Sequence, residues 1–107
     1  MTTFVNLTPH VINIVGKKTT TTTTIPTSGT VVRVSMTRTT VSTDGNIPIT
    51  RVVYGPVVGL PLPAPDTVFI VSGLVRVGNG RPDLASPGQL VRDIDGKVEG
   101  CESLDMD

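Results

Sequence analysis

The chain has 107 residues, which is enough for one domain with one hydrophobic core. Its net charge is zero and its aromatic residues are one Tyr and two Phe, which argues against nucleic-acid binding, because that function uses a dense basic stripe with stacking side chains. The single cysteine excludes an internal disulfide and a cysteine-based metal site. No apolar run approaches the roughly 18 residues of a membrane span, and the start of the chain lacks the pattern of a signal peptide. We therefore expect a cytoplasmic protein with no membrane partner.

The composition favours strands throughout. Val and Thr contribute 17 residues each, whereas Ala contributes two. β-branched side chains lose rotamer freedom in helices and pack well on sheets, and the 11 Gly and 9 Pro mark turns. We expect a single all-β domain over residues 1–107, a small antiparallel sandwich or barrel of about six to eight strands with little or no helix.

The first third of the chain predicts two strands and a threonine-rich connection. Phe4–Val15 is expected to be extended and to bend at Thr8-Pro9, because proline fixes its own φ and biases the preceding residue away from helix. The six threonines of Thr19–Thr24 are interpreted as an exposed connection or edge strand. Thr30–Met36 then alternates as a strand does.

A hairpin is expected next, with strands Thr39–Thr43 and Ile47–Tyr54 on either side of a three-residue loop, Asp44-Gly45-Asn46. Four side chains of its second strand share one face, namely Ile47, Ile49, Arg51 and Val53. An arginine in the middle of an apolar row is unusual, because its charge must find a partner.

Thr67–Val77 is apolar on both faces and predicts a central strand, with Ser72 as its one inward polar group. The stretch from Gly78 to Gln89 is rich in turn residues and predicts a long loop, a kind of segment that often carries function.

The end of the chain predicts a second hairpin and a tail. Leu90–Ile94 and Lys97–Cys101 are expected to pair across a two-residue turn, Asp95-Gly96. Cys101 is interpreted as a small buried or half-buried hydrophobic residue. Residues 102–107 are acidic and are expected to be loose.

Charge is unevenly distributed along the chain. Residues 1–81 hold seven basic groups against two acids, a net of about +5, and residues 82–107 hold seven acids against two basic groups, a net of about −5. This asymmetry is consistent with an anion-binding face, with head-to-tail contact between copies, or with charges that cancel on an ordinary solvated surface.

Few residues are candidates for chemistry. His10 is the only side chain that titrates near neutrality unaided, and it suits either a general base or a hydrogen-bonded structural role. Metal binding by His10 with Asp83 or Asp93 lacks the spacing of a metal site, and no cofactor is predicted. In the stretch Gly78–Asp83, glycine N–H groups and Arg81 resemble an anion clamp, but Arg81 pairing with Asp83 or Asp93 explains the same residues.

Three stretches of the chain resemble a known family: Asn6-Leu7-Thr8-Pro9-His10 with Ile12, Phe69-Ile70-Val71-Ser72, and Arg81-Pro82-Asp83 followed by Arg92-Asp93 and Gly96. This pattern is similar to that of short uncharacterised proteins of tailed bacteriophages and actinobacterial genomes. The threonine run departs from the pattern as an insertion between the first two strands. The resemblance implies a phage or prophage setting, and thus a bacterial host cell, and it supplies no catalytic residue.

Two functional hypotheses follow. The first is a non-enzymatic protein that sequesters a small anionic ligand, such as a cyclic nucleotide or ADP-ribose derivative used as an immune signal in antiphage defence. Its predicted ligand-binding residues are Thr8, His10, Arg51, Ser72, Arg76, Arg81 and Asp83. The expected pocket lies between subunits of a homo-oligomer.

The second hypothesis is a structural or interaction protein, either a minor virion component or an inhibitor that docks on a host enzyme by strand addition. A third hypothesis is a small enzyme such as a phosphodiesterase, but the chain lacks the paired acid and base groups that such an enzyme needs. The first two hypotheses are distinguished by whether the arginines converge on one pocket.

Overall fold

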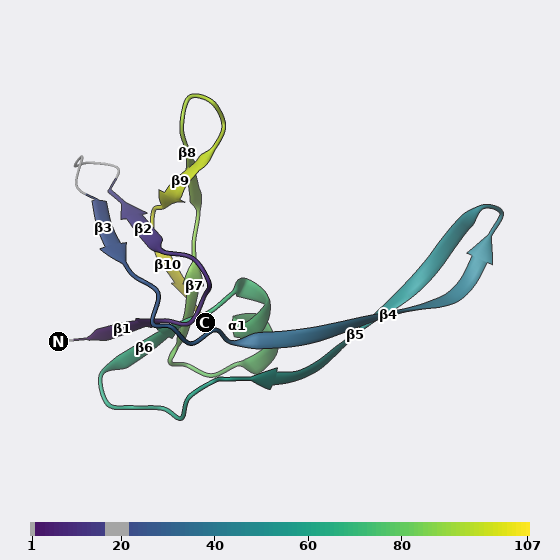
Figure 1. The fold of residues 1–107 in the computed structure, drawn as a ribbon, viewed down its shortest axis with the longest axis horizontal. Coiled ribbons are helices and arrows are strands. Elements are labelled where there is room, and N and C mark those ends of the chain that lie inside the picture. The colour runs from purple at the N-terminus through teal and green to yellow at the C-terminus, as the bar shows by residue number, and fades with distance from the viewer. Residues whose placement is uncertain (1, 17–21) are drawn as a thin grey trace.

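The chain forms a small body of two sheets and one short helix, from which a long hairpin projects (Figure 1). The computed structural model describes residues 2–16 and 22–107. The first sheet has the order β1-β6-β7-β10, made by Thr3–Asn6, Thr67–Ile70, Leu84–Pro87 and Leu104–Met106. The second has the order β3-β2-β9-β8, made by Thr22–Ile25, Ile12–Val15, Val98–Cys101 and Leu90–Arg92. The remaining elements are helix α1 (Gly73–Asn79) and the hairpin strands β4 (Arg33–Asp44) and β5 (Ile47–Val58).

The prediction of a mostly β protein is confirmed, but its details need correction. The described residues contain ten strands, more than the six to eight expected, and these strands form three separate sheets and not a closed barrel. Strand β6 runs parallel to both β1 and β7, and β2 runs parallel to β9, so the expectation of an antiparallel fold is wrong for these pairs. Alternation of side chains reveals which face of a strand is buried, but it carries no information about the direction of the neighbouring strand.

The predicted central strand over Thr67–Val77 is wrong beyond β6, because the chain turns into α1. Ser72, expected to point inward, is the exposed N-cap of this helix, and its hydroxyl accepts a hydrogen bond from the Val75 N–H at 3.3 Å. Gly80 ends the helix in the left-handed region at φ 72°. A short apolar run suits a strand and a half-buried helix equally well, so periodicity alone does not separate them.

Helix α1 connects β6 to the parallel β7, which lies inside the stretch that was predicted to be a loop. No helix formed by the described residues is both long and apolar enough to span a membrane.

Two hydrophobic clusters form the core of the body. The first combines Leu7, Phe69, Val71, Val75 and Leu84, and the partly buried Val34 and Val57 at the base of the hairpin pack against it. The second combines Ile12, Ile70 and Cys101, which come from β2, β6 and β9 and therefore join the two sheets. The interpretation of Cys101 as a buried hydrophobic residue is confirmed.

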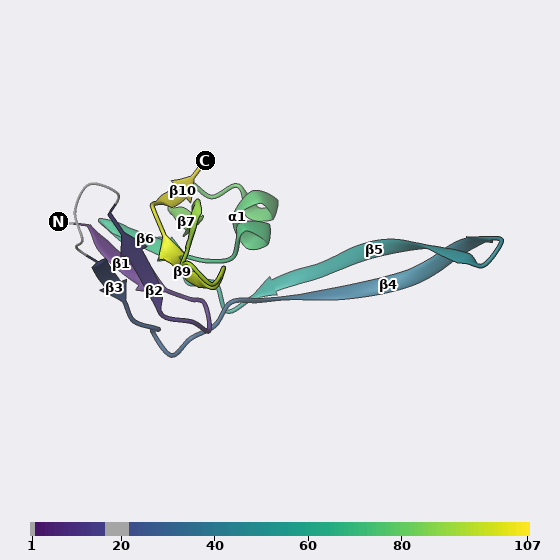
Figure 2. The same ribbon diagram turned by 90° about the horizontal axis from the view of Figure 1, so that it is seen from above.

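The β4–β5 hairpin, here called the arm, is the feature that sets the shape of the molecule (Figure 2). Each strand has 12 residues, and beyond the base they are exposed. The radius of gyration is 17.0 Å, whereas a compact chain of this length has about 13 Å. The predicted hairpin is confirmed, but it is longer than expected, because part of the strand predicted at Thr30–Met36 continues into β4. Its loop is also shorter than the predicted three residues, since Asp44 pairs with Ile47.

The second predicted hairpin is also confirmed, as β8 and β9. Its turn is longer than the predicted two residues, because the Asp93 N–H donates to the Lys97 carbonyl at 2.8 Å and closes a loop of three. The tail expected to be loose instead contains β10, which pairs with β7. Of the threonine run, Thr22–Thr24 belongs to the exposed edge strand β3, as predicted, and residues 19–21 lie outside the described residues.

Candidate functional site

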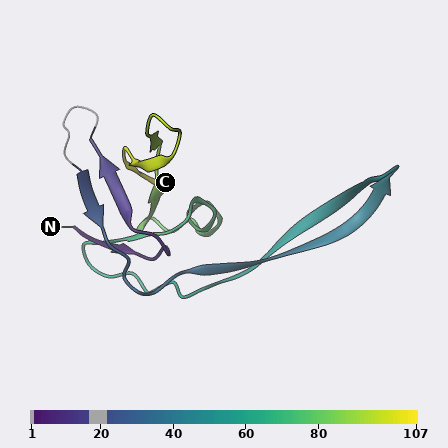
Figure 3. The same cartoon turned by 45° about the horizontal axis from the view of Figure 1, so that its top comes forward.

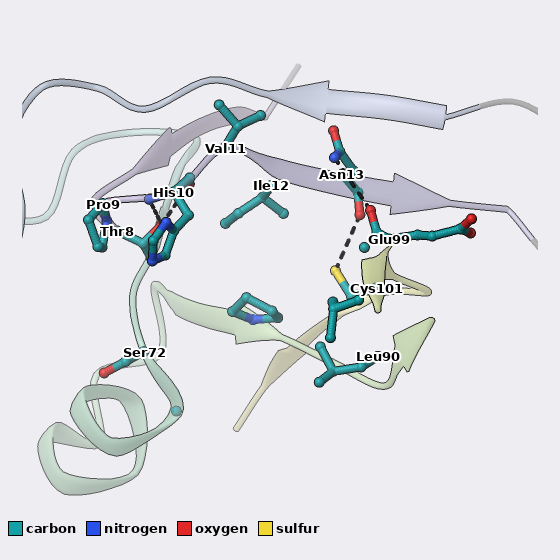
Figure 4. Close-up of a pocket in the computed structure, with 14 residues that line it drawn as sticks. Thr8, Pro9, His10, Val11, Ile12, Asn13, Ser72, Leu90, Glu99 and Cys101 are labelled. Carbon is teal, nitrogen blue, oxygen red and sulfur yellow. Dashed lines mark hydrogen bonds between the residues drawn. The ribbon is translucent and has the colours of Figure 1, made fainter. Parts of the chain in front are cut away.

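The body has an open cavity of about 530 Å³ between the N-terminal loop, the start of α1 and strand β9 (Figure 4). Its walls are mainly apolar and include Ile12 and Pro87. Its polar lining comes from Thr8, His10, Asn13, Ser72 and Glu99. No Lys or Arg of the described residues lines it. The volume falls within the range of small-molecule sites, which is roughly 300–1,000 Å³.

The N-terminal wall of the cavity is held in place by Asn6, which is 1% exposed. Its amide nitrogen donates to the carbonyls of His10 at 2.8 Å and Ile25 at 3.2 Å. Its side-chain oxygen accepts from the Thr8 N–H at 2.9 Å and the Thr8 hydroxyl at 2.6 Å. The turn at Thr8–His10 is thus determined by a buried amide. Asn6 belongs to the pentapeptide Asn6-Leu7-Thr8-Pro9-His10, but its structural role was not predicted from the sequence. The signal for it was an Asn two residues before a Thr-Pro bend, a spacing typical of Asx turns.

Three of the seven predicted ligand-binding residues meet in this cavity, namely Thr8, His10 and Ser72. The Thr8 hydroxyl lies 2.6 Å from Asn6 Oδ1 and 2.9 Å from the His10 carbonyl oxygen and shares its one hydrogen between these acceptors, so it is occupied by the turn. The His10 side chain is exposed, as is Ser72. These residues can form hydrogen bonds with a bound ligand, but they supply no permanent positive charge.

Arg81 and Asp83 do not reach the cavity and bind each other. Arg81 Nε lies 2.9 Å from Asp83 Oδ1, and its NH2 lies 2.6 Å from Oδ2, which is a bidentate pair. The third guanidinium nitrogen donates to the Pro61 carbonyl at 2.8 Å, and the group lies 6.0 Å from the centre of the Phe69 ring. Hydrogen bonding between the two side chains raises the pKa of Arg81 and lowers that of Asp83. Of the two interpretations left open for Arg81, the structure supports the loop-holding pair with Asp83.

Arg76 is also occupied within the body. Its Nε donates to the Ser86 hydroxyl at 2.8 Å, and its NH1 pairs with the Asp107 carboxylate. Arg51 lies on the arm, is exposed and forms no ion pair with the described residues. The predicted arginines therefore share no cavity within one copy of the chain.

The other candidates for chemistry are separate from one another. The Cys101 thiol is 2% exposed and lies 3.7 Å from the Asn13 carbonyl, to which it donates. In the described part of the chain, no three His, Cys, Asp or Glu side chains gather as metal ligands would.

Comparison of the chain with protein-family models, with curated proteins and with solved structures finds no match.

Proposed function

We propose that this chain is a non-enzymatic interaction protein that assembles with further copies of itself, and that the arm is the element that makes the contact. The observation that carries this proposal is the exposure of the arm on both faces. Met36, Val52 and Tyr54 are exposed on one face, and Ile47, Ile49 and Val53 are exposed on the other. In a monomer these side chains would all remain in water.

An isolated two-stranded ribbon is marginally stable in water, and a hairpin normally needs a third strand or a packed face. Only the base of the arm has such a face, through Val34 and Val57. The remaining length gains its stability most readily by burying its apolar side chains against another chain, since exposed apolar patches mark interaction sites. A self-assembling component suits the phage or prophage setting that the family resemblance implies.

The test is to remove the arm and measure the size of the particle. In the shortened variant, residues 37–53 are replaced by an Asn-Gly turn, which keeps the Met36–Tyr54 pair and the packed base. Light scattering behind a sizing column should show an oligomer for the full chain and a monomer for the shortened one. A full chain that stays monomeric at high protein concentration contradicts the proposal.

A second candidate function is capture of a small anionic ligand, such as a cyclic nucleotide or an ADP-ribose derivative. It is favoured by the cavity, which brings Thr8, His10 and Ser72 together. Arg76 and Arg81 form ion pairs within the body. The guanidinium group that binds the anionic ligand would therefore come from the arm of a neighbouring copy. Calorimetry with a panel of such nucleotides tests it, and binding that requires the arm would support it. Heats no larger than those of dilution throughout the panel would remove this candidate.

A further inference from the structure

One row of the arm combines apolar side chains with a single charge, that of Arg51, which forms no ion pair with the described residues. Ile47, Ile49, Arg51 and Val53 alternate along β5, so they share one face, as the sequence predicted. The three apolar members are 68%, 47% and 54% exposed, respectively. Their partners across the hairpin offer mainly hydroxyl groups, because Val53 lies opposite Thr37, Arg51 opposite Thr39, and Ile49 opposite Ser42. This row, here called the β5 row, presents one cation between apolar neighbours.

The cavity of the body also has apolar walls, but the charged residue in its lining is negative. Val11, Leu90 and Val98 line it, and each is about half exposed, at 52%, 49% and 51%. Glu99 is the one acid in the lining, and it forms no ion pair with the described residues. Figure 4 shows the Glu99 side chain extending outward from β9, away from the other labelled lining residues. The cavity therefore has apolar walls and, at its edge, one anion that forms no ion pair with the described residues.

The charges of the two chain segments are also of opposite sign. Residues 33–58 of the arm hold three arginines against Asp44, whereas residues 90–107 hold six acids, of which Asp107 pairs with Arg76, against Arg92 and Lys97. Opposite charges of this kind steer association and determine which surfaces meet. The cavity is out of reach of its own arm, which leads away from β2 and β9 in all three views (Figures 1, 2 and 3). The arm that fits the cavity must therefore come from a different molecule.

We infer that the arm of one copy lies in the cavity of a second copy, with Arg51 beside Glu99 and with Ile49 and Val53 against the apolar walls. This inference rests on the proposed self-association and specifies its contact. A second copy is the committed partner, because both complementary surfaces belong to this chain. The chain as a whole carries no net charge, so repeated copies do not accumulate electrostatic repulsion.

The area of the contact indicates a closed assembly. A strand of 12 residues is about 40 Å long, and two strands with their side chains are about 10 Å wide, so one face of the arm offers at most about 400 Å². Counting both partners, one docked arm buries at most about 800 Å², which is less than the roughly 1,200–2,000 Å² of specific interfaces. Two docked arms per pair of copies bury at most about 1,600 Å², which lies within that range. We therefore expect every copy both to donate an arm and to receive one, as in a two-fold dimer.

Charge reversal provides the test. Arg51→Glu and Glu99→Arg each place like charges together, and each should raise the dissociation constant of the assembly at least about tenfold. The double variant, which carries both substitutions in one chain, restores an attractive pair and should assemble within about threefold of the unmodified chain. Sedimentation velocity over a dilution series measures all three. Circular dichroism confirms that these exposed positions leave the fold unchanged.

Two matched control variants test whether the change in the dissociation constant is specific to Arg51 and Glu99. Arg38 lies on the opposite face of the arm, across from Val52, so Arg38→Glu should leave the dissociation constant within about threefold. Asp95 is an exposed acid in the β8–β9 turn and does not line the cavity, so Asp95→Lys should have an equally small effect. Single variants that assemble as tightly as the unmodified chain overturn the inference, as does a double variant weaker than both. If the shortened arm abolishes assembly but these variants do not, self-association stands and only the cavity contact is wrong.

Discussion

Replacing Asn6 by Ala removes four hydrogen bonds from the inside of the fold. Two of them are donated to the carbonyls of His10 and Ile25, and two are accepted from Thr8. A hydrogen bond of this kind contributes about 1 kcal/mol net, and a buried group left without a partner costs about 1–3 kcal/mol. Because the Thr8 hydroxyl and the His10 carbonyl keep their own hydrogen bond, we expect a loss of about 3 kcal/mol rather than the full sum.

The assay for this prediction is urea unfolding followed by circular dichroism. With a slope of about 1–3 kcal/mol/M, the midpoint should fall by about 1–3 M. All variants are compared at one protein concentration, because association adds to the apparent stability. Asn13→Ala is the matched control, since Asn13 makes two exposed hydrogen bonds, at 3.4 Å and 3.0 Å, and we expect it to lose less than about 1 kcal/mol. Equal effects of the two substitutions would refute the view that Asn6 holds the cavity wall.

Three further predictions concern the ion pair of the body, the close approach of two strands and helix α1. Because Arg81 lowers the pKa of Asp83 in the folded state, the pair contributes its full stability above the unfolded pKa of about 3.9 and loses it as the pH falls through the lower folded value. The free energy of unfolding should therefore fall more steeply between about pH 5 and pH 2 for the unmodified chain than for Asp83→Asn, and parallel curves would argue against the pair. Gly100→Ala should destabilise the fold by about 1–3 kcal/mol, because the new Cβ would lie 2.4 Å from the Asn13 carbonyl oxygen. Gly78 lies in α1, and a Cβ added there would have no atom within 4 Å. Gly78→Ala should therefore stabilise the fold by about 0.5–1 kcal/mol in thermal unfolding, and a loss of stability would contradict a helical conformation at this position.

The features that sequence reasoning predicted well are those that depend on neighbouring residues. Both hairpins were located from glycine-containing turns between alternating segments, although the two loop lengths were wrong by one residue in opposite directions. The apolar row around Arg51 also follows from alternation alone, and the structure shows that its members share a face.

The site required information that lies far apart in the chain. Thr8, His10 and Ser72 meet because β1 and β6 pair in parallel across about sixty intervening residues, a pairing that no local pattern specifies. The arginines were assigned to one ligand because free guanidinium groups suit anions. Arg81 instead forms an ion pair with Asp83, which lies two residues further along the chain. Arg76 forms an ion pair with Asp107, which only the packed fold brings near.

By itself, the sequence determined that this protein is built mainly from strands, where its hairpins turn, and that one strand of the arm carries an arginine between apolar residues. These properties follow from backbone preferences and side-chain alternation, which act within a few residues. Only the tertiary structure decided the direction of the paired strands, the helix at Gly73–Asn79, the buried role of Asn6 and the exposure of the arm beyond its base. Each of these depends on which distant surfaces pack together, because a side chain is buried or exposed according to its neighbours in space and not according to its neighbours in the chain.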